Sequence, residues 1–390
     1  MPHAGIAALE RGLAGLDRDG LRRTRRVLDS PQGPVVREGG EELVNFASND
    51  YLGLASHPRI LAAAHAAIDE YGFGAGASPL VVGHARAHEE AEEAFARFTG
   101  MPRALLFGSG YAANLGILTA LADRSAAIFA DRLDHACFVD GALLSRAEFH
   151  RYPHGDLGRL EAMLAASQSA VRIIATDAVF SMDGDVAPVA ELLELAERHD
   201  AWLVLDDAHG IGVLGGGRGS LAEFGLASPR IVCMATLGKA LGGYGAFVAG
   251  DADMIEWLMQ RARTYVFSTA LPPAAAAVAT AALALIEADP SIVRALHARI
   301  GEFRRACEAQ GVAASSATAI QPVIVGESAR AVALSARMRE AGLLVPAIRP
   351  PTVPQGTARL RISLSAAHTR VQVETLVSAL AQALDDGAAR

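Results

Sequence analysis

Residues 201–210, which read Ala-Trp-Leu-Val-Leu-Asp-Asp-Ala-His-Gly, decide the fold class of this chain. The apolar run Ala201–Leu205 ends at two carboxylates, Asp206 and Asp207, and His209 follows. A short apolar run that ends in polar and glycine residues is typical of a buried strand. A carboxylate at the end of such a strand is costly to bury unless it has a partner. An isolated aspartate there is ordinarily a cap or turn residue, so the neighbouring strands decide its role.

The next apolar run, Ile231–Ala235, leads directly into Thr236-Leu237-Gly238-Lys239. Lys239 is the only lysine among the 35 lysine and arginine residues of the chain. An exposed lysine that survived by chance is one interpretation. However, a lysine amine can lose its proton in a suitable environment, whereas a guanidinium cannot. An acid, Asp206, and the only amine, Lys239, thus lie at the ends of two strands. Pyridoxal phosphate (PLP) needs such a pair, because the acid keeps its ring nitrogen protonated and the amine binds its aldehyde.

Other short apolar runs alternate with segments of helical length along the first part of the chain. We expect strands at Ala104–Phe107, Ala127–Ala130, Val171–Thr176 and Ala246–Val248, and helices at Leu157–Ser167 and Val189–His199. Such alternation predicts an α/β fold, with a mostly parallel sheet and helices on both of its faces. In these folds ligands bind at the carboxyl ends of the strands, where Asp206 and Lys239 lie.

The pattern changes near residue 285, where an α+β arrangement begins. The helices expected there are Ser291–Gln310, Ala329–Ala341 and Thr369–Asp385, and the strands are Gln321–Val325, Leu343–Ile348 and Arg359–Leu364. We therefore expect an N-terminal segment over residues 1–45, with a helix and then a Pro/Gly stretch. A large PLP-binding domain over 46–284 and a small C-terminal domain over 285–390 follow.

Composition excludes several classes of protein. A hydrophobic content of 51% and a net charge of −8 are typical of a globular chain that does not bind nucleic acid. The three cysteines, Cys137, Cys233 and Cys307, have neither metal-site nor disulfide spacing, which fits a reducing cytoplasm and no metal. No signal peptide is apparent at the N-terminus. The uncharged run at residues 264–286 is interrupted by Pro272-Pro273, so we expect a buried helix from there and no membrane span.

A site for the cofactor phosphate is expected at Phe107-Gly108-Ser109-Gly110-Tyr111, between a strand and the helix Ala112–Leu121. Free backbone amides at the start of a helix bind anions, although a turn of small residues alone is common. Thr236 adds a hydroxyl, and His135 follows another strand and could stack on a flat ring or be structural. A serine hydrolase built on Ser109 is an alternative, but the glycine–X–serine–X–glycine elbow is missing.

Further stretches occur in the order that one enzyme family shows. They are Ser48–Leu54, Gly110-Tyr111, Asp131–His135, Phe180–Asp185, Asp206–Gly210, Thr236–Lys239, Phe267–Thr269, Arg349–Pro354 and Gly356–Arg361. On these residues, nearly the whole chain resembles the α-oxoamine synthases, which are fold-type I PLP-dependent transferases. The resemblance is greatest to the members that act in biotin biosynthesis.

The resemblance implies a role for each of a set of residues. For the cofactor, Lys239 would bind its aldehyde, Asp206 would pair with the ring nitrogen, and His209 would contact the ring hydroxyl. His135 would stack on the ring and position substrate, beside Ser181, Gly110, Tyr111 and Thr236. Ser268 and Thr269 would reach the phosphate across a homodimer interface. For the substrates, the resemblance implies Asn49 and Arg361 at the amino-acid carboxylate with Arg349 nearby, and Arg22 and Thr352 at the acyl group.

The reaction that the resemblance implies is an acyl transfer with loss of carbon dioxide. L-alanine and a pimeloyl thioester, carried by coenzyme A or an acyl carrier protein, would give 8-amino-7-oxononanoate. Lys239 would act both as covalent anchor and as general base. Alternatives within the family are 2-amino-3-ketobutyrate ligase, 5-aminolevulinate synthase and serine palmitoyltransferase. A protein with this fold that binds ligand without catalysis is an alternative of another class.

The sequence departs from the family pattern at a few positions. Pro79 follows Ser78 where an arginine is usual, and Val82 and His84 also differ from the expected residues. Asp134 stands where we expect asparagine or serine. These differences concern the acyl-donor channel or the dimer contact rather than the cofactor site.

Overall fold

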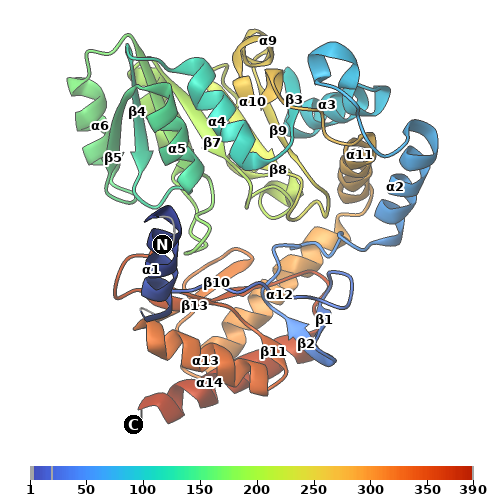
Figure 1. Ribbon diagram of the computed structural model, residues 1–390, viewed down its shortest axis with the longest axis vertical. Coiled ribbons are helices and arrows are strands. Elements are labelled where there is room, and N and C mark those ends of the chain that lie inside the picture. The colour runs from blue at the N-terminus through green and yellow to red at the C-terminus, as the bar shows by residue number, and fades with distance from the viewer. Residues whose placement is uncertain (1–3, 19–20, 389–390) are drawn as a thin grey trace.

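The structure is a computed structural model that describes residues 4–18 and 21–388. A seven-stranded sheet forms the upper part of the molecule in Figure 1, with strand order β3-β9-β8-β7-β6-β4-β5. Its strands are β3 (Arg103–Phe107), β4 (Ala126–Asp131), β5 (Glu148–Tyr152), β6 (Val171–Asp177), β7 (Ala201–Asp206), β8 (Ile231–Thr236) and β9 (Ala246–Gly250). Only β9 runs antiparallel to its neighbours in this sheet. The predicted α/β fold with a mostly parallel sheet is confirmed.

Both faces of this sheet are buried. Consecutive residues of β6 show this, because Ile173 and Ile174 are both fully buried and belong to two separate core clusters. Strands buried on both faces are apolar throughout, which is why they could be recognised as unbroken runs. The helices of this part are α2 (Pro58–Tyr71), α3 (Arg86–Thr99), α4 (Gly110–Leu121), α5 (Ala136–Ser145), α6 (Leu157–Ala166), α7 (Val189–Arg198), α8 (Ser220–Phe224), α9 (Ala252–Arg261), α10 (Arg263–Val266) and α11 (Pro273–Ala288).

A second, smaller part lies below the sheet in Figure 1. It contains the antiparallel strands β10 (Ile320–Gly326), β13 (Ala358–Ser363) and β12 (Ala347–Ile348), and the helices α12 (Ser291–Ala309), α13 (Ser328–Glu340) and α14 (Arg370–Ala388). The predicted α+β character is therefore confirmed. Residues 343–348 do not form the single strand that we expected. β11 (Leu343–Leu344) pairs with another sheet, and Pro346, which has no N–H to donate, separates it from β12.

The N-terminal segment joins this smaller part. After α1 (Ala4–Arg18), β1 (Val35–Glu38) pairs with β2 (Glu41–Asn45), and β2 pairs with β11. The helix at the front is confirmed, whereas β1 and β2 were not predicted from the sequence. The domain limits stay a prediction, and the division expected at residues 284 and 285 falls inside α11.

The uncharged run after Thr264 contains the expected buried helix, which begins at Pro273 and packs on α2 and α3. Within residues 4–18 and 21–388, no single helix is long and apolar enough to cross a membrane. The helices α11 and α12 meet that test only together, as a pair bent by 76°.

Candidate active site

The only lysine amine lies against a histidine at the carboxyl ends of β7 and β8. Lys239 Nζ is 2.8 Å from His209 Nε2, and His209 Nδ1 is 2.7 Å from the hydroxyl of Tyr51. Burial lowers the pKa of Lys239, and burial together with the charge of Lys239 lowers the pKa of His209 well below its usual value. Both shifts are toward the neutral form of the group.

The carboxylate that ends β7 is held by two donors. Asp206 Oδ2 accepts a hydrogen bond of 2.7 Å from the amide of Asn114, and Asp206 Oδ1 accepts one of 2.9 Å from the backbone N–H of Ala208. Asn114 lies on α4 and is fully buried. The sequence analysis missed this residue. The available signal was an amide within a predicted helix of otherwise small and apolar residues.

A second buried carboxylate lies opposite Asp206 in the sheet. Asp177 ends β6 in register with Asp206, and burial, together with the charge of Asp206, raises its pKa well above the usual value. Among the described residues, Asp177 Oδ1 and Asn114 Oδ1 have no hydrogen-bond partner. Buried polar atoms are normally paired, so these two atoms mark a place where further donors would be accommodated.

His135 begins α5 directly after the loop that follows β4. Its Nδ1 accepts from the backbone N–H of Cys137 at 3.3 Å, and burial lowers its pKa. Asp134 lies below it and joins two strands, because its carboxylate accepts from the backbone N–H groups of Asp131 and Asp177 at 2.7 and 3.0 Å. The departure at position 134 is therefore a buried structural acceptor.

Arg361 on β13 gathers the residues expected at the substrate carboxylate. Its Nη1 donates to Asn49 Oδ1 at 3.0 Å, and its Nε donates to the backbone carbonyl of Ser181 at 2.6 Å. The Tyr51 hydroxyl also donates to Asn49 Oδ1, at 3.1 Å. Arg361 is buried, and these hydrogen bonds fix its guanidinium in place where the large and small parts of the molecule meet.

The expected phosphate turn lies at the start of α4. Ser109 caps this helix by accepting from the N–H of Ala112 at 3.1 Å. A Cβ at Gly110 would lie 3.4 Å from Met234 and 3.9 Å from Thr236, so the turn and the end of β8 are neighbours. The exposed Tyr111 donates to Asp140 at 2.5 Å.

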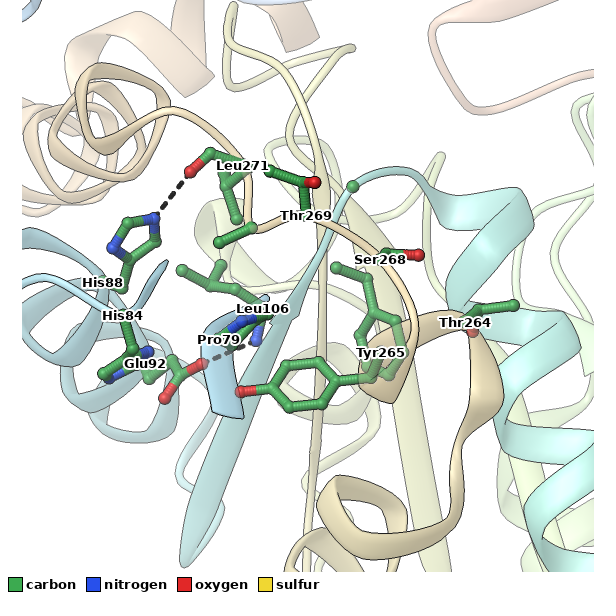
Figure 2. Close-up of a pocket in the computed structure, with 13 residues that line it drawn as sticks. Pro79, His84, His88, Glu92, Leu106, Thr264, Tyr265, Ser268, Thr269 and Leu271 are labelled. Carbon is green, nitrogen blue, oxygen red and sulfur yellow. Dashed lines mark hydrogen bonds between the residues drawn. The ribbon is translucent and has the colours of Figure 1, made fainter. Parts of the chain in front are cut away.

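Ser268 and Thr269 lie apart from Lys239 and the residues that contact it. They line a cavity of about 20 Å³, which Figure 2 shows. His84, His88 and Glu92 are among the residues that line the same cavity. Burial raises the pKa of Glu92 to about 7. No hydrogen bond between described residues joins Ser268 or Thr269 to the Lys239 group.

The two residues expected at the acyl group, Thr352 and Arg22, lie in different places. Thr352 lines a pocket of about 560 Å³ together with His135 and Ser181, and the Thr352 N–H donates to the carbonyl of Arg349 at 3.1 Å. Arg22 lies after α1 with half of its side chain exposed, and pairs with Asp17 at 2.7 Å. The structure thus brings Thr352 to the pocket but does not bring Arg22 there.

The chain matches the model of the family "Aminotransferase class I and II" over residues 41–380. A relative named 8-amino-7-oxononanoate synthase, from Methylobacillus flagellatus, is 56% identical over 96% of this chain and 95% of its own length. This chain belongs to the class I and II aminotransferases, and within them to the α-oxoamine synthases.

Solved structures of the family superpose on most of the chain. A serine palmitoyltransferase of S. paucimobilis with bound PLP–myriocin aldimine has a TM-score of 0.91 and 27% identity, over 98% of both chains. The 8-amino-7-oxononanoate synthase of Francisella tularensis has a TM-score of 0.77 and 30% identity, over 89% of this chain and 99% of that one. The resemblance seen in the sequence and the expected PLP cofactor are confirmed.

The residues present fit this cofactor. Three features lie together at the carboxyl ends of the strands. They are a buried amine with a lowered pKa, an acid held by two donors, and a capped helix start. The unpartnered Asp177 and Asn114 oxygens beside Asp206 leave acceptor capacity there. A metal-like spacing does occur at His84, Glu89 and Glu92, where the possible ligand atoms lie within 4.8 Å of one another. Without any further sign of an ion, this cluster supports no metal site.

Proposed function

We propose that this chain condenses L-alanine with a pimeloyl thioester, releasing carbon dioxide and the thiol carrier and giving 8-amino-7-oxononanoate for biotin biosynthesis. The observation that carries the chemistry is the Lys239 amine, 2.8 Å from His209 and one strand from Asp206. The choice of substrates is supported by relatives of this name at 50 to 56% identity over 95% or more of the chain.

Bound PLP supplies a ring that withdraws electrons from the carbon next to the amino group of a substrate joined to its aldehyde. Lys239 would hold the cofactor through its aldehyde, and its amine would act as a base when alanine takes its place. Because burial lowers the pKa of its amine, Lys239 is better suited to remove the α-proton of alanine as a general base. These two roles require an amine, which explains why arginine has not replaced this lysine.

His209 fixes the orientation of that amine. The Tyr51 hydroxyl donates to Asn49 and accepts from Arg361 Nη2 at 3.5 Å, and its second lone pair accepts a hydrogen bond from His209 Nδ1. This leaves His209 Nε2 as the acceptor that faces Lys239 Nζ. Tyr51 thus favours the His209 tautomer that is protonated at Nδ1, and in this tautomer the Nε2 lone pair faces the amine.

Asp206 would keep the ring nitrogen of the cofactor protonated. Hydrogen bonds from Asn114 and Ala208 hold its two carboxylate oxygens in place. A protonated ring nitrogen makes the cofactor a better electron acceptor, so this pairing is the electrostatic part of the mechanism.

The charged and apolar side chains at the pocket indicate where each group of the substrates binds. Arg361, with Asn49 beside it, offers a fixed cation for the carboxylate of alanine. The pocket of about 560 Å³ is lined by His135, Ser181 and Thr352, and by apolar side chains that suit an acyl chain, namely Leu133, Val139 and Val353. Arg22 remains a proposed acyl contact that would require the segment after α1 to move.

A homodimer is part of this proposal. Val81, Val82 and Phe267 are 73, 80 and 71% exposed, and they flank the cavity of Ser268 and Thr269 in sequence. Exposed apolar side chains of this size indicate a covered surface, and an isologous partner would cover it. Ser268 and Thr269 would then reach the phosphate in the partner subunit. The cytoplasm remains the predicted location, in keeping with three free, buried cysteines.

The test is to identify the product by mass spectrometry after offering alanine, glycine or serine with pimeloyl, acetyl, succinyl or palmitoyl thioesters. We expect 8-amino-7-oxononanoate from alanine and the pimeloyl thioester at the highest kcat/KM. A clear preference for glycine or serine would assign the chain to one of the other family activities. The acyl carrier is tested by supplying the pimeloyl group on coenzyme A and on a carrier protein.

A further inference from the structure

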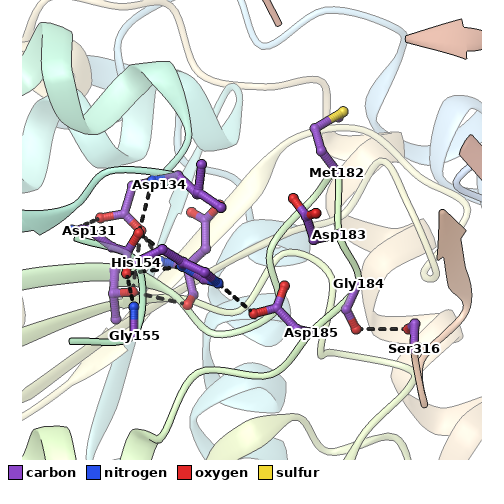
Figure 3. Close-up of polar contacts among 12 residues, drawn as sticks. Asp131, Asp134, His154, Gly155, Met182, Asp183, Gly184, Asp185 and Ser316 are labelled. Atoms are coloured by element: carbon purple, nitrogen blue, oxygen red, sulfur yellow. Dashed lines mark hydrogen bonds and ion pairs between the residues drawn. The ribbon is translucent and has the colours of Figure 1, made fainter. Parts of the chain in front are cut away.

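His154 lies between two carboxylates that belong to different parts of the active-site framework. Its Nδ1 is 3.1 Å from both carboxylate oxygens of Asp131, and its Nε2 is 2.9 Å from Asp185 Oδ2 (Figure 3). The edge of Phe180 packs on the imidazole at 4.5 Å between ring centroids, with an angle of 86° between the rings. None of the proposed chemical steps uses His154.

The two carboxylates favour the protonated form of this imidazole. Ionised carboxylates only accept hydrogen bonds, so a ring with a carboxylate at each nitrogen must carry a proton on both. Consistently, the hydrogen bonds from Asp131 and Asp185 raise the pKa of His154 to about 10. His154 is thus a small, rigid cation with two opposed donors.

Asp131, which contacts His154 Nδ1, fixes the loop that ends in His135. Asp131 is the last residue of β4, is 2% exposed, and its Oδ1 accepts from the backbone N–H of Leu133 at 2.8 Å. Its own N–H donates to Asp134 at 2.7 Å. Asp131 therefore sets the path of the loop that ends in His135.

The Asp185 side leads to the turn at residues 180–185, which carries Ser181. Two hydrogen bonds close this turn, from the Phe180 N–H to the Asp185 carbonyl at 3.0 Å and from the Gly184 N–H to the Phe180 carbonyl at 2.8 Å. The carbonyl of Ser181 accepts from Arg361 Nε. The position of this turn thus bears directly on the proposed carboxylate site.

The opposite side of the same turn is held by the smaller part of the molecule. The carbonyl of Gly184 accepts from Ser316 and Thr318, each at 2.9 Å, and Asp183 pairs with Arg359 on β13. Gly184 has φ +70°, and a Cβ there would lie 2.3 Å from the carbonyl oxygen of Ile320. The turn is thus attached tightly to the smaller part, and His154 attaches it to β4.

We propose that His154 is a positioning residue, whose imidazolium fastens the 180–185 turn to the loop that carries His135 and so sets Arg361 and His135 in register. This assignment rests on the proposed function for the roles of those two residues. An exposed ion pair contributes little, but the Asp131 carboxylate is almost fully buried and has no alternative cation among the residues described.

The test compares His154→Gln with wild-type holoenzyme, using His150→Gln as the matched control. His150 lies on the neighbouring strand β5, where it pairs with Glu148 at 3.5 Å and stacks on Phe129 of β4, and among the described residues no hydrogen bond or ion pair joins its side chain to either loop. We expect His154→Gln to raise the Kd for L-alanine, measured from the cofactor absorbance, and to lower kcat, each on the order of tenfold. Cofactor content and cooperative unfolding should be retained. Asp185→Ala removes the acceptor of His154 Nε2 at the more exposed end of the contact and should reproduce these changes.

Hydrogen exchange gives a readout that does not depend on activity. In both variants the backbone amides of Phe180 and Gly184 should exchange faster, while those of β7 stay protected. The double variant should be no worse than either single variant in alanine affinity, since both remove one contact. Folded, cofactor-loaded variants with wild-type alanine affinity and unchanged exchange at the turn would overturn the proposal. Failure of wild-type protein to make the expected product would instead count against the proposed function, because alanine binding is measured without acyl donor.

Discussion

The amide of Asn114 lies 2.7 Å from the carboxylate of Asp206, so a side chain of α4 holds the acid at the end of β7. Asn114 is fully buried, and its amide also lies 3.1 Å from the Cys137 sulfur. The carboxylate therefore has a fixed neighbour within the protein as well as the cofactor that it serves.

Asn114→Leu should impair both stability and catalysis. The variant keeps the side-chain volume but leaves Asp206 Oδ2 without its protein donor. Leaving a buried acceptor unpaired costs about 1–3 kcal/mol of unfolding free energy. Chemical unfolding of the variant should show this loss, and kcat should fall because Asp206 is less well held. Thr119→Val, on the same helix, removes a hydrogen bond to the Leu115 carbonyl and serves as control. Unchanged kcat/KM in Asn114→Leu would show that Asp206 is positioned by the backbone alone.

Lys239→Arg should abolish turnover while keeping a positive charge. The guanidinium cannot bind the aldehyde or take the α-proton, so we expect no product above background. In wild-type protein, borohydride should attach the cofactor to the peptide that contains Lys239, and mass spectrometry would locate it. A labelled peptide that lacks residue 239 would refute the assignment.

A mixture of two inactive chains should regain activity if the active sites are shared between subunits. Lys239→Ala and Thr269→Ala would be prepared separately, each folded and strongly impaired, and then allowed to exchange subunits. If Thr269 serves the site of the partner, each mixed dimer has one site with both defects and one with neither. Activity should then recover in part. An absence of recovery after confirmed exchange would place Thr269 in the site of its own chain or outside any site.

His368 should make the protein less stable in acid. Its Nδ1 accepts from the N–H of Ser365 and its Nε2 donates to the carbonyl of Asn45, both at 3.0 Å, so the buried ring is neutral. Burial lowers its pKa to about 4, whereas an unfolded chain binds this proton near pH 6.5. The unfolded state therefore gains the proton first as pH falls, and stability is lost between about pH 6.5 and pH 4. The loss is on the order of 3 kcal/mol at pH 4.

His368→Gln is the variant that isolates this effect. Unfolding free energies of both proteins would be measured from pH 7 to pH 4. The wild-type curve should fall more steeply than that of the variant, because glutamine does not titrate. Parallel curves would mean that other groups cause the acid sensitivity.

The sequence predicted the central sheet well because its strands are buried on both faces and so are apolar runs. β5 was missed because it lies at the edge of the sheet and three of its five residues, Glu148–Tyr152, are polar, so it is not an apolar run. β1 and β2 were missed because they are short and largely polar, and the pairing of β2 with β11 joins residues some 300 positions apart. Local patterns do not report such distant partners.

Within the candidate site, the placement of Lys239, Asp206 and His209 followed from their positions after strands. Tyr51, Asn114 and His154 were not predicted as site residues, because they contact these residues or their loops from elements distant in sequence. Their contacts depend on three-dimensional packing. Arg22 shows the opposite case, because the resemblance assigned it a role at a pocket where the structure does not place it.

The solitary side-chain amine has a practical consequence for chemical labelling. Reagents that acylate or reductively alkylate lysines will find only Lys239 among the side chains, and bound cofactor will protect it. Protection from such a reagent would therefore report cofactor occupancy directly, without a background from other lysines. Surface coupling through lysine will fail for the same reason, and immobilisation of this protein will need another functional group.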